Sequence, residues 1–275
     1  MNDKGLINFR DIGGLKVPTG VLRPDYFYRS GQISGITPEQ SEFLQNDCRI
    51  RDVYDFRSTD EVEQAPDTDL VHAKYYHIDI LSDKTSNGAS LGAMITDGSQ
   101  VRQNMLKTYE SIVLSESARK GYHDFMMGLL SDNAPILFHC FAGKDRTGFA
   151  AAVILRGAGA DDQQIMDDYM LTNKLRVQAN KDILNRFKSE MNQQQLDNLH
   201  TALMVDSDYL KHAQDVLLDH FGTFDHYLQN GLDLPSDYIA QFRNNLWSNH
   251  KFGKRKGMQP VSSDGSHPFY YFLGF

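Results

Sequence analysis

Apolar positions along the chain follow two rhythms, and the first of them predicts β-strands. Aromatic and β-branched residues crowd the runs 49–56 (RIRDVYDF) and 73–81 (AKYYHIDIL). The run 135–140 (PILFHC) is short and continuously apolar, which is typical of a strand buried on both faces of a sheet. Before these runs, NFRDIGGL and YFYRSGQI look like short extended pieces punctuated by glycine.

The second rhythm, with apolar residues three and four positions apart, predicts helices over most of the remaining chain. Thr37 is expected to cap a first helix over TPEQSEFLQ. Helical spacing then covers 100–131 and 147–159, followed by further stretches at about 161–175, 180–204, 207–230 and 236–247. Strands followed by helices in this order predict an α/β domain with a helical C-terminal part packed on it.

Two segments break these rhythms. Residues 82–99 are polar and glycine-rich, and we expect a long loop there of the kind that is often functional in a compact domain. Residues 249–275 carry a basic cluster followed by aromatic residues. We expect these last residues to be a tail outside a single domain at 1–248. A contact of this tail with a membrane surface is the alternative.

Composition narrows the classes of protein to consider. Among 275 residues, 40% are hydrophobic and 23% are charged, as in ordinary globular proteins, and the net charge of -8 disfavours a general nucleic-acid binder. No apolar run is long enough to cross a membrane, so we expect no stable membrane insertion. The two cysteines, Cys48 and Cys140, suit a reducing cytoplasm and suggest neither a disulfide framework nor a zinc site. Secretion stays open if a signal segment has been removed.

The segment FHCFAGKDRTG (138–148) carries the most specific chemistry of the chain. Cys140 and Arg146 stand six positions apart, between a predicted strand and a predicted helix. Such a loop can turn its backbone N–H groups inward as an anion nest, and the helix adds positive potential at its N-terminus. That field favours the thiolate form of a cysteine. Arg146 can hold two oxygens of a phosphoryl group, and Gly143 permits close backbone approach.

This loop resembles the signature loop of the cysteine-dependent tyrosine phosphatase superfamily, in its bacterial branch of atypical tyrosine and phosphoinositide phosphatases. The resemblance covers about residues 6–247. It extends to NFRDIGGL (8–15), YRSGQ (28–32), VYDFRSTDEVE (53–63), DDYMLTN (167–173) and FGTFDHYLQNGL (221–232). It implies a tyrosine phosphatase-like fold with a central, mainly parallel sheet flanked by helices.

The resemblance also implies a two-step hydrolysis of phosphate monoesters. Cys140 attacks phosphorus to give a cysteinyl-phosphate, and water then releases inorganic phosphate. The substrate is held by the loop residues Phe141, Ala142, Gly143, Lys144, Asp145, Arg146 and Thr147. Thr147 is expected either to place its hydroxyl on the thiolate or to cap the helix. No cofactor and no metal are expected.

The general acid that protonates the leaving oxygen has three candidates. Asp145 lies inside the loop and comes first. Asp79 and then Asp83 follow it, in the loop after the strand at 73–81, where the superfamily usually keeps this acid. Lys144 is expected at the rim of the loop as a second cation, attractive to substrates with further phosphates. Phosphotyrosine is therefore the expected substrate, with phosphoserine, phosphothreonine and phosphoinositides as further possibilities.

Other residues are expected to support the loop. His139 should order it through hydrogen bonds to the backbone, while Asp55 and Arg57 should join Arg10, Asp11 and Arg29 in charge networks. Cys48 is expected to be buried, and a reversible disulfide with Cys140 remains open. The helices around 180–204 are expected either to pack as ordinary core or, by resemblance to a mycobacterial relative, to form a mobile lid.

Three other functions compete with this interpretation. A nucleotide P-loop is excluded, because Phe138 stands where its first glycine belongs and Asp145 follows the lysine. A rhodanese-like sulfurtransferase also places a cysteine in an anion-binding loop. A catalytically weak phosphate-binding module is the third alternative, although an intact Cys140 and Arg146 disfavour it.

Overall fold

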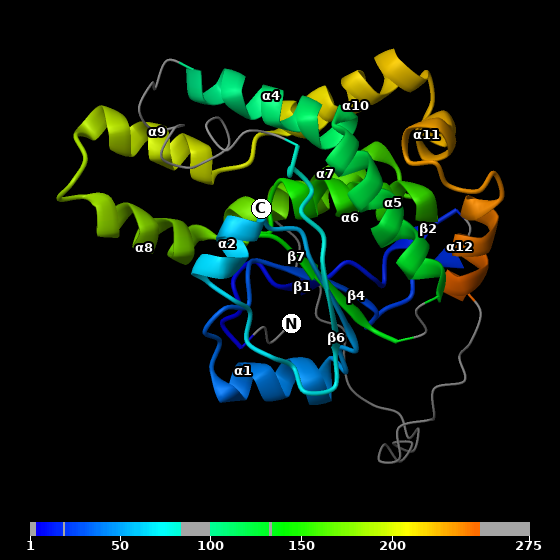
Figure 1. The fold of residues 1–275 in the computed structure, drawn as a ribbon, viewed down its shortest axis with the longest axis horizontal. Helices are drawn as coiled ribbons and strands as arrows, with labels where there is room; N and C mark the ends of the chain where they lie inside the picture. Colours follow the sequence, from blue (N-terminus) through cyan, green and yellow to red (C-terminus); the bar gives the residue numbers. More distant parts are fainter. Residues whose placement is uncertain (1–3, 19, 84–99, 132–133, 248–275) are drawn as a thin grey trace, which may run out of the picture.

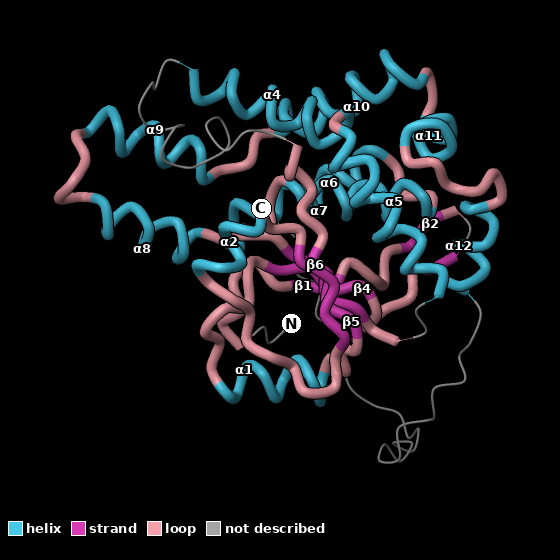
Figure 2. Tube along the Cα trace, in the orientation of Figure 1, coloured by secondary structure: helices cyan, strands magenta, loops and turns pink. Residues whose placement is uncertain are grey.

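The structure is a computed structural model, and it describes residues 4–18, 20–83, 100–131 and 134–247. Figure 1 shows a small sheet with most of the helices gathered on one side of it and α1 (Pro38–Glu42) on the other. The last third of the chain is helical, as the apolar spacing predicts. The same division between helices and strands is visible in Figure 2.

The central sheet has the strand order β1-β4-β7-β5-β6. Its strands are β1 (Arg10–Asp11), β4 (Phe27–Ser30), β5 (Asp52–Asp55), β6 (Lys74–His77) and β7 (Ile136–His139). Neighbouring strands from β4 to β6 are parallel, and β1 pairs antiparallel with β4. A separate hairpin joins β2 (Lys16–Val17) to β3 (Gly20–Val21). The predicted mainly parallel sheet is confirmed.

Strand β7 lies in the middle of this sheet because it is apolar on both faces. Ile136 and Phe138 point into the larger core under the helices, while Leu137 points into a smaller core on the opposite face. All four residues of β7 are buried. The alternation of side chains along a strand therefore explains why a continuously apolar run is needed here.

Helices cover both faces of the sheet unequally. The smaller core lies under α1 and the following π-helical turn, Phe43–Asp47. The larger core lies under α4 (Val101–Leu114), α5 (Glu116–Ser131), α6 (Arg146–Ala158), α7 (Asp162–Leu175) and α10 (Ser207–Phe221). The remaining helices are α2 (Thr59–Gln64), α8 (Val177–Phe187), α9 (Gln193–Leu203), α11 (Phe224–His226), the π-helical turn Tyr227–Gly231 and α12 (Tyr238–Trp247).

Capping chemistry fixes several of these helix ends. Thr37 begins α1 as the predicted cap, and it forms a capping box: it accepts from the backbone N–H of Gln40 while the Gln40 side chain accepts from the N–H of Thr37. Gly159 ends α6 in the left-handed conformation, with φ of 100°. Glycine at that position explains why the apolar helix after the cysteine loop stops where the sequence predicts.

Three predicted helical ranges are interrupted or end early in the structure. The helical stretch 100–131 is divided at Ser115 into α4 and α5, and 180–204 contains most of α8 and all of α9. The stretch 207–230 ends as a regular helix at Phe221, where Gly222 takes a φ of 77°. Apolar periodicity continues across each break, so the pattern alone does not show the turns. The predicted long loop at 82–99 lies outside the described residues from 84 onward.

Candidate active site

The cysteine loop connects the carboxyl end of β7 to the amino end of α6. Cys140 follows the last residue of the strand and is 2% exposed, and Arg146 is the first residue of the helix. Because β7 lies between β4 and β5, the loop opens at the edge where the parallel strands end. Ligands commonly bind at that edge of a parallel sheet.

Gly143 allows the loop to approach the neighbouring strand. Its φ is 67°, and a Cβ atom built there would lie 2.1 Å from the carbonyl oxygen of Ser30. Both the left-handed backbone and this contact exclude a side chain. The prediction that this position requires glycine is confirmed.

Three buried side chains hold the loop from outside by donating to its carbonyl groups. Asn8 donates to the carbonyls of Ala142 at 3.2 Å and Gly143 at 2.8 Å. Arg29 donates to Gly143 at 2.8 Å, and Arg176 donates to Ala142 at 2.9 Å. Since the C=O and N–H of a trans peptide point in opposite directions, the two amides that share these peptide groups point away from these donors. The arrangement supports an anion nest on the inner side of the loop.

Arg146 is held by Glu61, a residue to which the sequence analysis assigns no role. The guanidinium donates to Glu61 from Nη1 at 2.6 Å and from Nη2 at 3.0 Å, and Nη1 also donates to the carbonyl of Phe56 at 3.1 Å. These contacts are made by the two Nη atoms at the end of the guanidinium. Among the described residues Nε has no hydrogen-bond partner, so the Nε–Nη2 edge is available to two oxygens of a phosphoryl group.

The electrostatics of this pair favour charged forms of both groups. Burial works against the charge on Arg146, but attraction by Cys140 and Glu61 outweighs it and raises the pKa of the guanidinium. Burial likewise favours the neutral form of Glu61, yet the charge and hydrogen bonds of Arg146 lower the pKa of its carboxyl. The pair therefore remains ionised while it orients the arginine.

Asp145 lies in a network of buried hydroxyl groups. Tyr109 of α4 donates to its Oδ1 at 2.9 Å, and the hydroxyl oxygens of Tyr109 and Tyr169 are 2.6 Å apart. Both tyrosines are buried, at 0% and 1% exposure. Asp145 makes no side-chain cap to α6. Its carboxylate is therefore positioned by residues from α4 and α7.

Lys144 differs from the expectation of an exposed rim cation. It is 5% exposed, and its Nζ lies 3.0 Å from Oδ2 of Asp145 and donates to the carbonyl of Met204 at 3.4 Å. The chain directly after α9 covers this amine. The sequence of the loop alone does not predict this contact. Phe141, in contrast, is 40% exposed beside Cys140.

Asp79 and Asp83 are each engaged by groups outside the cysteine loop. Oδ2 of Asp79 accepts from the backbone N–H of Thr59 at the start of α2, and Oδ1 accepts from the N–H of Leu81. Asp83 accepts from the backbone and hydroxyl of Ser117 at the start of α5. Each carboxylate thus satisfies the free N–H groups of a helix end.

Thr147 takes neither of its two expected roles in the structure, on the thiolate or as a cap. Its hydroxyl is buried and, within the part of the chain that the structure describes, has no hydrogen-bond partner. The hydroxyl does not cap α6, because the helix begins one residue earlier without any side-chain cap.

The charge network predicted around Asp55 and Arg57 is present and includes Asp67. Arg57 donates from Nη2 to Asp55 at 2.7 Å and to Asp67 at 2.8 Å. Nε2 of His139 lies 2.7 Å from Asp67, and its Nδ1 lies 3.3 Å from the carbonyl of Cys140. His139 therefore links the network to the loop, as predicted. Asp55, Asp67 and His139 have the spacing of metal ligands, but Arg57 already donates hydrogen bonds to both carboxylates.

A second network joins Arg10 and Arg29 through Asp168. The carboxylate accepts from Nε of Arg10 at 2.6 Å and from Nη1 of Arg29 at 2.5 Å. Burial opposes ionisation of Asp168, but the two arginines lower the pKa of its carboxyl. The expectation that Asp11 belongs to this network is wrong, because its carboxylate accepts from the backbone N–H groups of Gly13 and Asp25.

Cys48 is buried, as predicted, but the fold does not favour a disulfide with Cys140. Cys48 packs in the smaller core on one face of the sheet, whereas Cys140 belongs to the larger core. Both thiols are free. A disulfide requires Cα atoms within about 7 Å, so this crosslink would demand a rearrangement of the sheet.

Sequence reasoning misses the side chains from distant segments that contact the loop or the residues holding it: Asn8, Glu61, Asp67, Tyr109, Asp168, Tyr169 and Arg176. Several of them lie inside the blocks quoted for the family resemblance, which is the one signal that could have pointed to them. Nothing in the spacing of Tyr109 or Arg176 distinguishes them from ordinary helix residues.

Comparisons with known proteins agree with this geometry. The model of the tyrosine phosphatase family matches residues 1–248. The triple specificity protein phosphatase PtpB of Mycobacterium tuberculosis is 27% identical over 257 residues, which cover 82% of this chain and 91% of that protein. A Cupriavidus necator protein named as a tyrosine-protein phosphatase is 27% identical over 240 residues, covering 86% and 84% of the two chains.

Among solved structures, the core catalytic domain of PP-IP phosphatase SIW14 from S. cerevisiae matches at 16% identity. The match covers 76% of this chain and 91% of that domain, with a TM-score of 0.29. Similarity at that level does not bear on the reaction. In the described residues, no helix combines the length and apolar character needed to cross a membrane.

Proposed function

The chain belongs to the tyrosine phosphatase family and is a cysteine-dependent phosphoric monoester hydrolase, and from this premise we propose that Cys140 is its nucleophile and Arg146 its phosphate-binding cation. The thiolate attacks phosphorus in line, a sulfur–phosphorus bond forms, and the oxygen–phosphorus bond to the leaving group breaks. The observation that supports this assignment is the position of Cys140 between a strand end and a helix beginning at Arg146.

The transition-state charge is stabilised by the loop backbone and by Arg146. The inner amides and the amino end of α6 supply positive potential at the phosphoryl oxygens. Glu61 holds the guanidinium so that its Nε–Nη2 edge can take two of those oxygens. Because these groups are held by hydrogen bonds before substrate arrives, little reorganisation is needed during the reaction.

Asp145 is the general acid in this proposal. It donates a proton to the leaving oxygen in the first step and accepts one from water in the second, when the cysteinyl-phosphate is hydrolysed to inorganic phosphate. Tyr109 and Lys144 hold its carboxylate beside the loop. Asp79 is a weaker candidate, because both its oxygens accept from backbone N–H groups.

We infer that phosphotyrosine is the principal substrate. Phe141 is exposed beside the nucleophile and offers a ring face against which a flat phenyl group can pack. Phosphoserine, phosphothreonine and phosphoinositides are further candidates, and the name of the M. tuberculosis relative, a triple specificity protein phosphatase, supports testing more than one substrate class. Lys144 would have to leave Asp145 before it could contact a second phosphate, so the structure favours it less for that role than the sequence does.

Residues 1–248 are proposed to form one catalytic domain, a division supported by the range of the family match. Two free cysteines support the proposed cytoplasmic location.

Cys140→Ser should abolish turnover of para-nitrophenyl phosphate, because a hydroxyl is a far weaker nucleophile than a thiolate at neutral pH. Cys48→Ser is the matched control, since that thiol lies in the other core, and it should retain activity. Release of phosphate from phosphotyrosine peptides, phosphoserine peptides and phosphoinositides would then rank the substrates.

Equal activity of Cys140→Ser and the native chain would refute the proposed nucleophile. A native chain that binds phosphate without hydrolysing any ester would be a binding module, and one that turns over thiosulfate instead would be a sulfurtransferase.

A further inference from the structure

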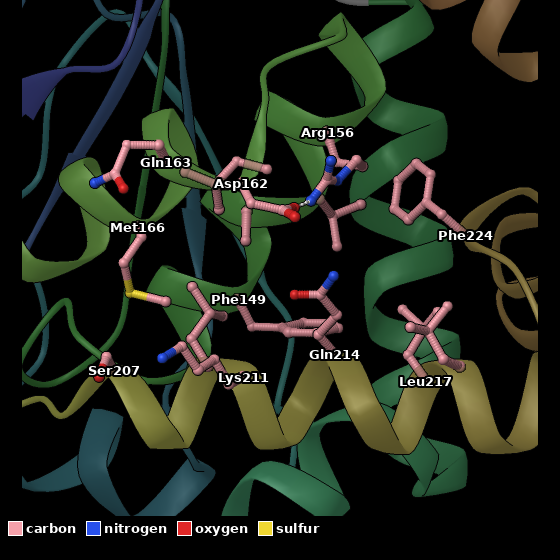
Figure 3. A pocket seen from close by; sticks show the side chains of 15 residues that line it. Phe149, Arg156, Asp162, Gln163, Met166, Ser207, Lys211, Gln214, Leu217 and Phe224 are labelled. Carbon is pink, nitrogen blue, oxygen red and sulfur yellow. Dashed lines mark hydrogen bonds and ion pairs between the residues drawn. The ribbon is translucent and has the colours of Figure 1, made fainter.

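A cavity of about 560 Å³ lies between α10 on one side and α6 and α7 on the other (Figure 3). None of its lining residues belongs to the cysteine loop or to the networks that support it. Its volume falls within the range of small-molecule sites in proteins. The proposed phosphatase reaction makes no use of it.

The floor of the cavity is apolar. Phe149 and Val153 of α6 face Leu210 and Leu217 of α10, and all four side chains are 3–7% exposed to solvent. Facing apolar side chains on packed helices normally interdigitate and leave few voids. An open apolar cavity between these helices can therefore accept an apolar group.

The two ends of the cavity differ in polarity. Figure 3 shows Phe224 and Leu217 at one end, and Ser207 and Lys211 at the other. Ser207, Lys211, Gln214 and Leu218 follow one face of α10, and the span from the first to the last is about 16 Å at 1.5 Å per residue. A long, thin ligand with one polar end fits this lining.

Two cations line the cavity, Arg156 and Lys211. On the rim, Arg156 is already paired with Asp162. Lys211 is exposed, and within the described ranges of the chain its amine forms no ion pair or hydrogen bond. The rim therefore carries one positive charge that a ligand can neutralise, in a chain whose net charge is -8.

We propose that this cavity binds a monoanionic amphiphile, an aliphatic chain ending in a carboxylate. The chain lies over Phe149 and Val153 with its end against Phe224, and the carboxylate pairs with Lys211. Burial of the aliphatic chain contributes most of the affinity, because it removes apolar surface from water. The exposed ion pair selects the sign of the head group and contributes less.

Dodecanoate below its micellar concentration is the probe. Isothermal titration calorimetry on the full chain should give a Kd on the order of 10–100 μM, as expected of a ligand of this size. Lys211→Glu should weaken binding by about fivefold or more, because repulsion replaces attraction at the head group. Lys188→Glu, at an exposed lysine that does not line the cavity, is the matched control and should bind dodecanoate as the native chain does.

Ala152→Phe tests the cavity itself, because a ring at this lining position fills the space over the floor. It should abolish binding while the circular dichroism spectrum stays native. If that variant fails to fold, the comparison of Lys211→Glu with Lys188→Glu still decides the assignment. The proposal is overturned if dodecanoate does not bind, if Lys211→Glu binds it as well as the native chain, or if dodecylammonium binds equally well.

Discussion

Tyr109 illustrates, at the scale of one residue, how the chemistry of the site depends on a side chain far away in sequence. The apolar spacing of its helix predicts that this tyrosine is buried, and it is. Its hydroxyl then requires a partner, which it finds in Asp145 at 2.9 Å and Tyr169 at 2.6 Å. Burial raises the pKa of Tyr109, and the charge of Asp145 raises it further, so the hydroxyl remains a donor.

Tyr109→Phe should therefore lower kcat by about tenfold without a comparable change in KM, because Asp145 loses an orienting hydrogen bond. The loss should be larger for phosphotyrosine than for para-nitrophenyl phosphate, whose better leaving group depends less on the acid. Tyr238→Phe is the matched control, since this buried tyrosine donates to the carbonyl of Met126 away from the loop. Equal losses with both substrates would indicate a merely structural role for Tyr109.

The hairpin formed by α8 and α9 shows what is decided at the scale of an element. Figure 1 shows it projecting from the body of the molecule beside α2. The two helices share a small apolar cluster around Leu199 and Leu203, separate from the main cores. Two contacts join the base of this hairpin to the cysteine loop. Arg176 donates to a carbonyl of the loop, and the carbonyl of Met204 accepts from the amine of Lys144. These contacts place the base of the hairpin against the cysteine loop, as the lid hypothesis requires.

Replacing residues 180–204 with a short glycine linker should increase the sensitivity of Cys140 to peroxide if the hairpin shields the loop. The measurement is the rate of inactivation by peroxide, with inorganic phosphate present or absent, alongside turnover of a bulky phosphopeptide. Unchanged inactivation and unchanged KM for the phosphopeptide would show that the hairpin is ordinary packing.

At the scale of the whole molecule, buried ion pairs connect the sheet, the loop and α7. Burial would raise the pKa of Asp55, but His139 and Arg57 lower it to about 2 from 3.8. Burial would lower the pKa of His139, yet its contacts with Asp67 and Asp55 raise it above 6.5. The contribution of Asp55 to folding stability is therefore lost as the pH falls, whereas that of His139 is lost as the pH rises.

Proton linkage determines how the contribution of Asp55 to folding stability changes with pH. Its folded-state pKa lies below the unfolded value, so its contribution is complete above about pH 4 and is lost as the pH falls towards 2. A shift of this size corresponds to about 2 kcal/mol. For His139 the contribution is complete below its unfolded value and is lost as the pH rises through its higher folded-state pKa.

Urea unfolding between pH 7 and pH 2.5 should therefore show a stability that falls in acid, and Asp55→Asn should flatten that fall while lowering stability at pH 7. Asp124→Asn, which removes an exposed partner of Lys120, should leave the slope unchanged. If the acid slope of Asp55→Asn equals that of the native chain, Asp55 does not carry the effect.

Local pattern accounts for much of the fold. Continuous apolarity places β7 at the centre of the sheet, the Thr37 capping box begins α1, and Gly159 ends α6. The turns inside 100–131 and 180–204 could not be predicted in the same way. Apolar spacing continues through them, and the positions of the breaks depend on which neighbouring helix each face packs against.

The sequence by itself determined that Cys140, Gly143 and Arg146 share one loop between a strand and a helix, because that arrangement depends on spacing over seven residues. It could not determine how Arg146 is oriented, which tyrosines hold Asp145, or that Lys144 is buried. Those contacts join segments that are tens of residues apart, such as Glu61 with Arg146 and Met204 with Lys144. Tertiary structure decided them, because hydrogen bonds and burial depend on distance in space, whereas a local motif records only order along the chain.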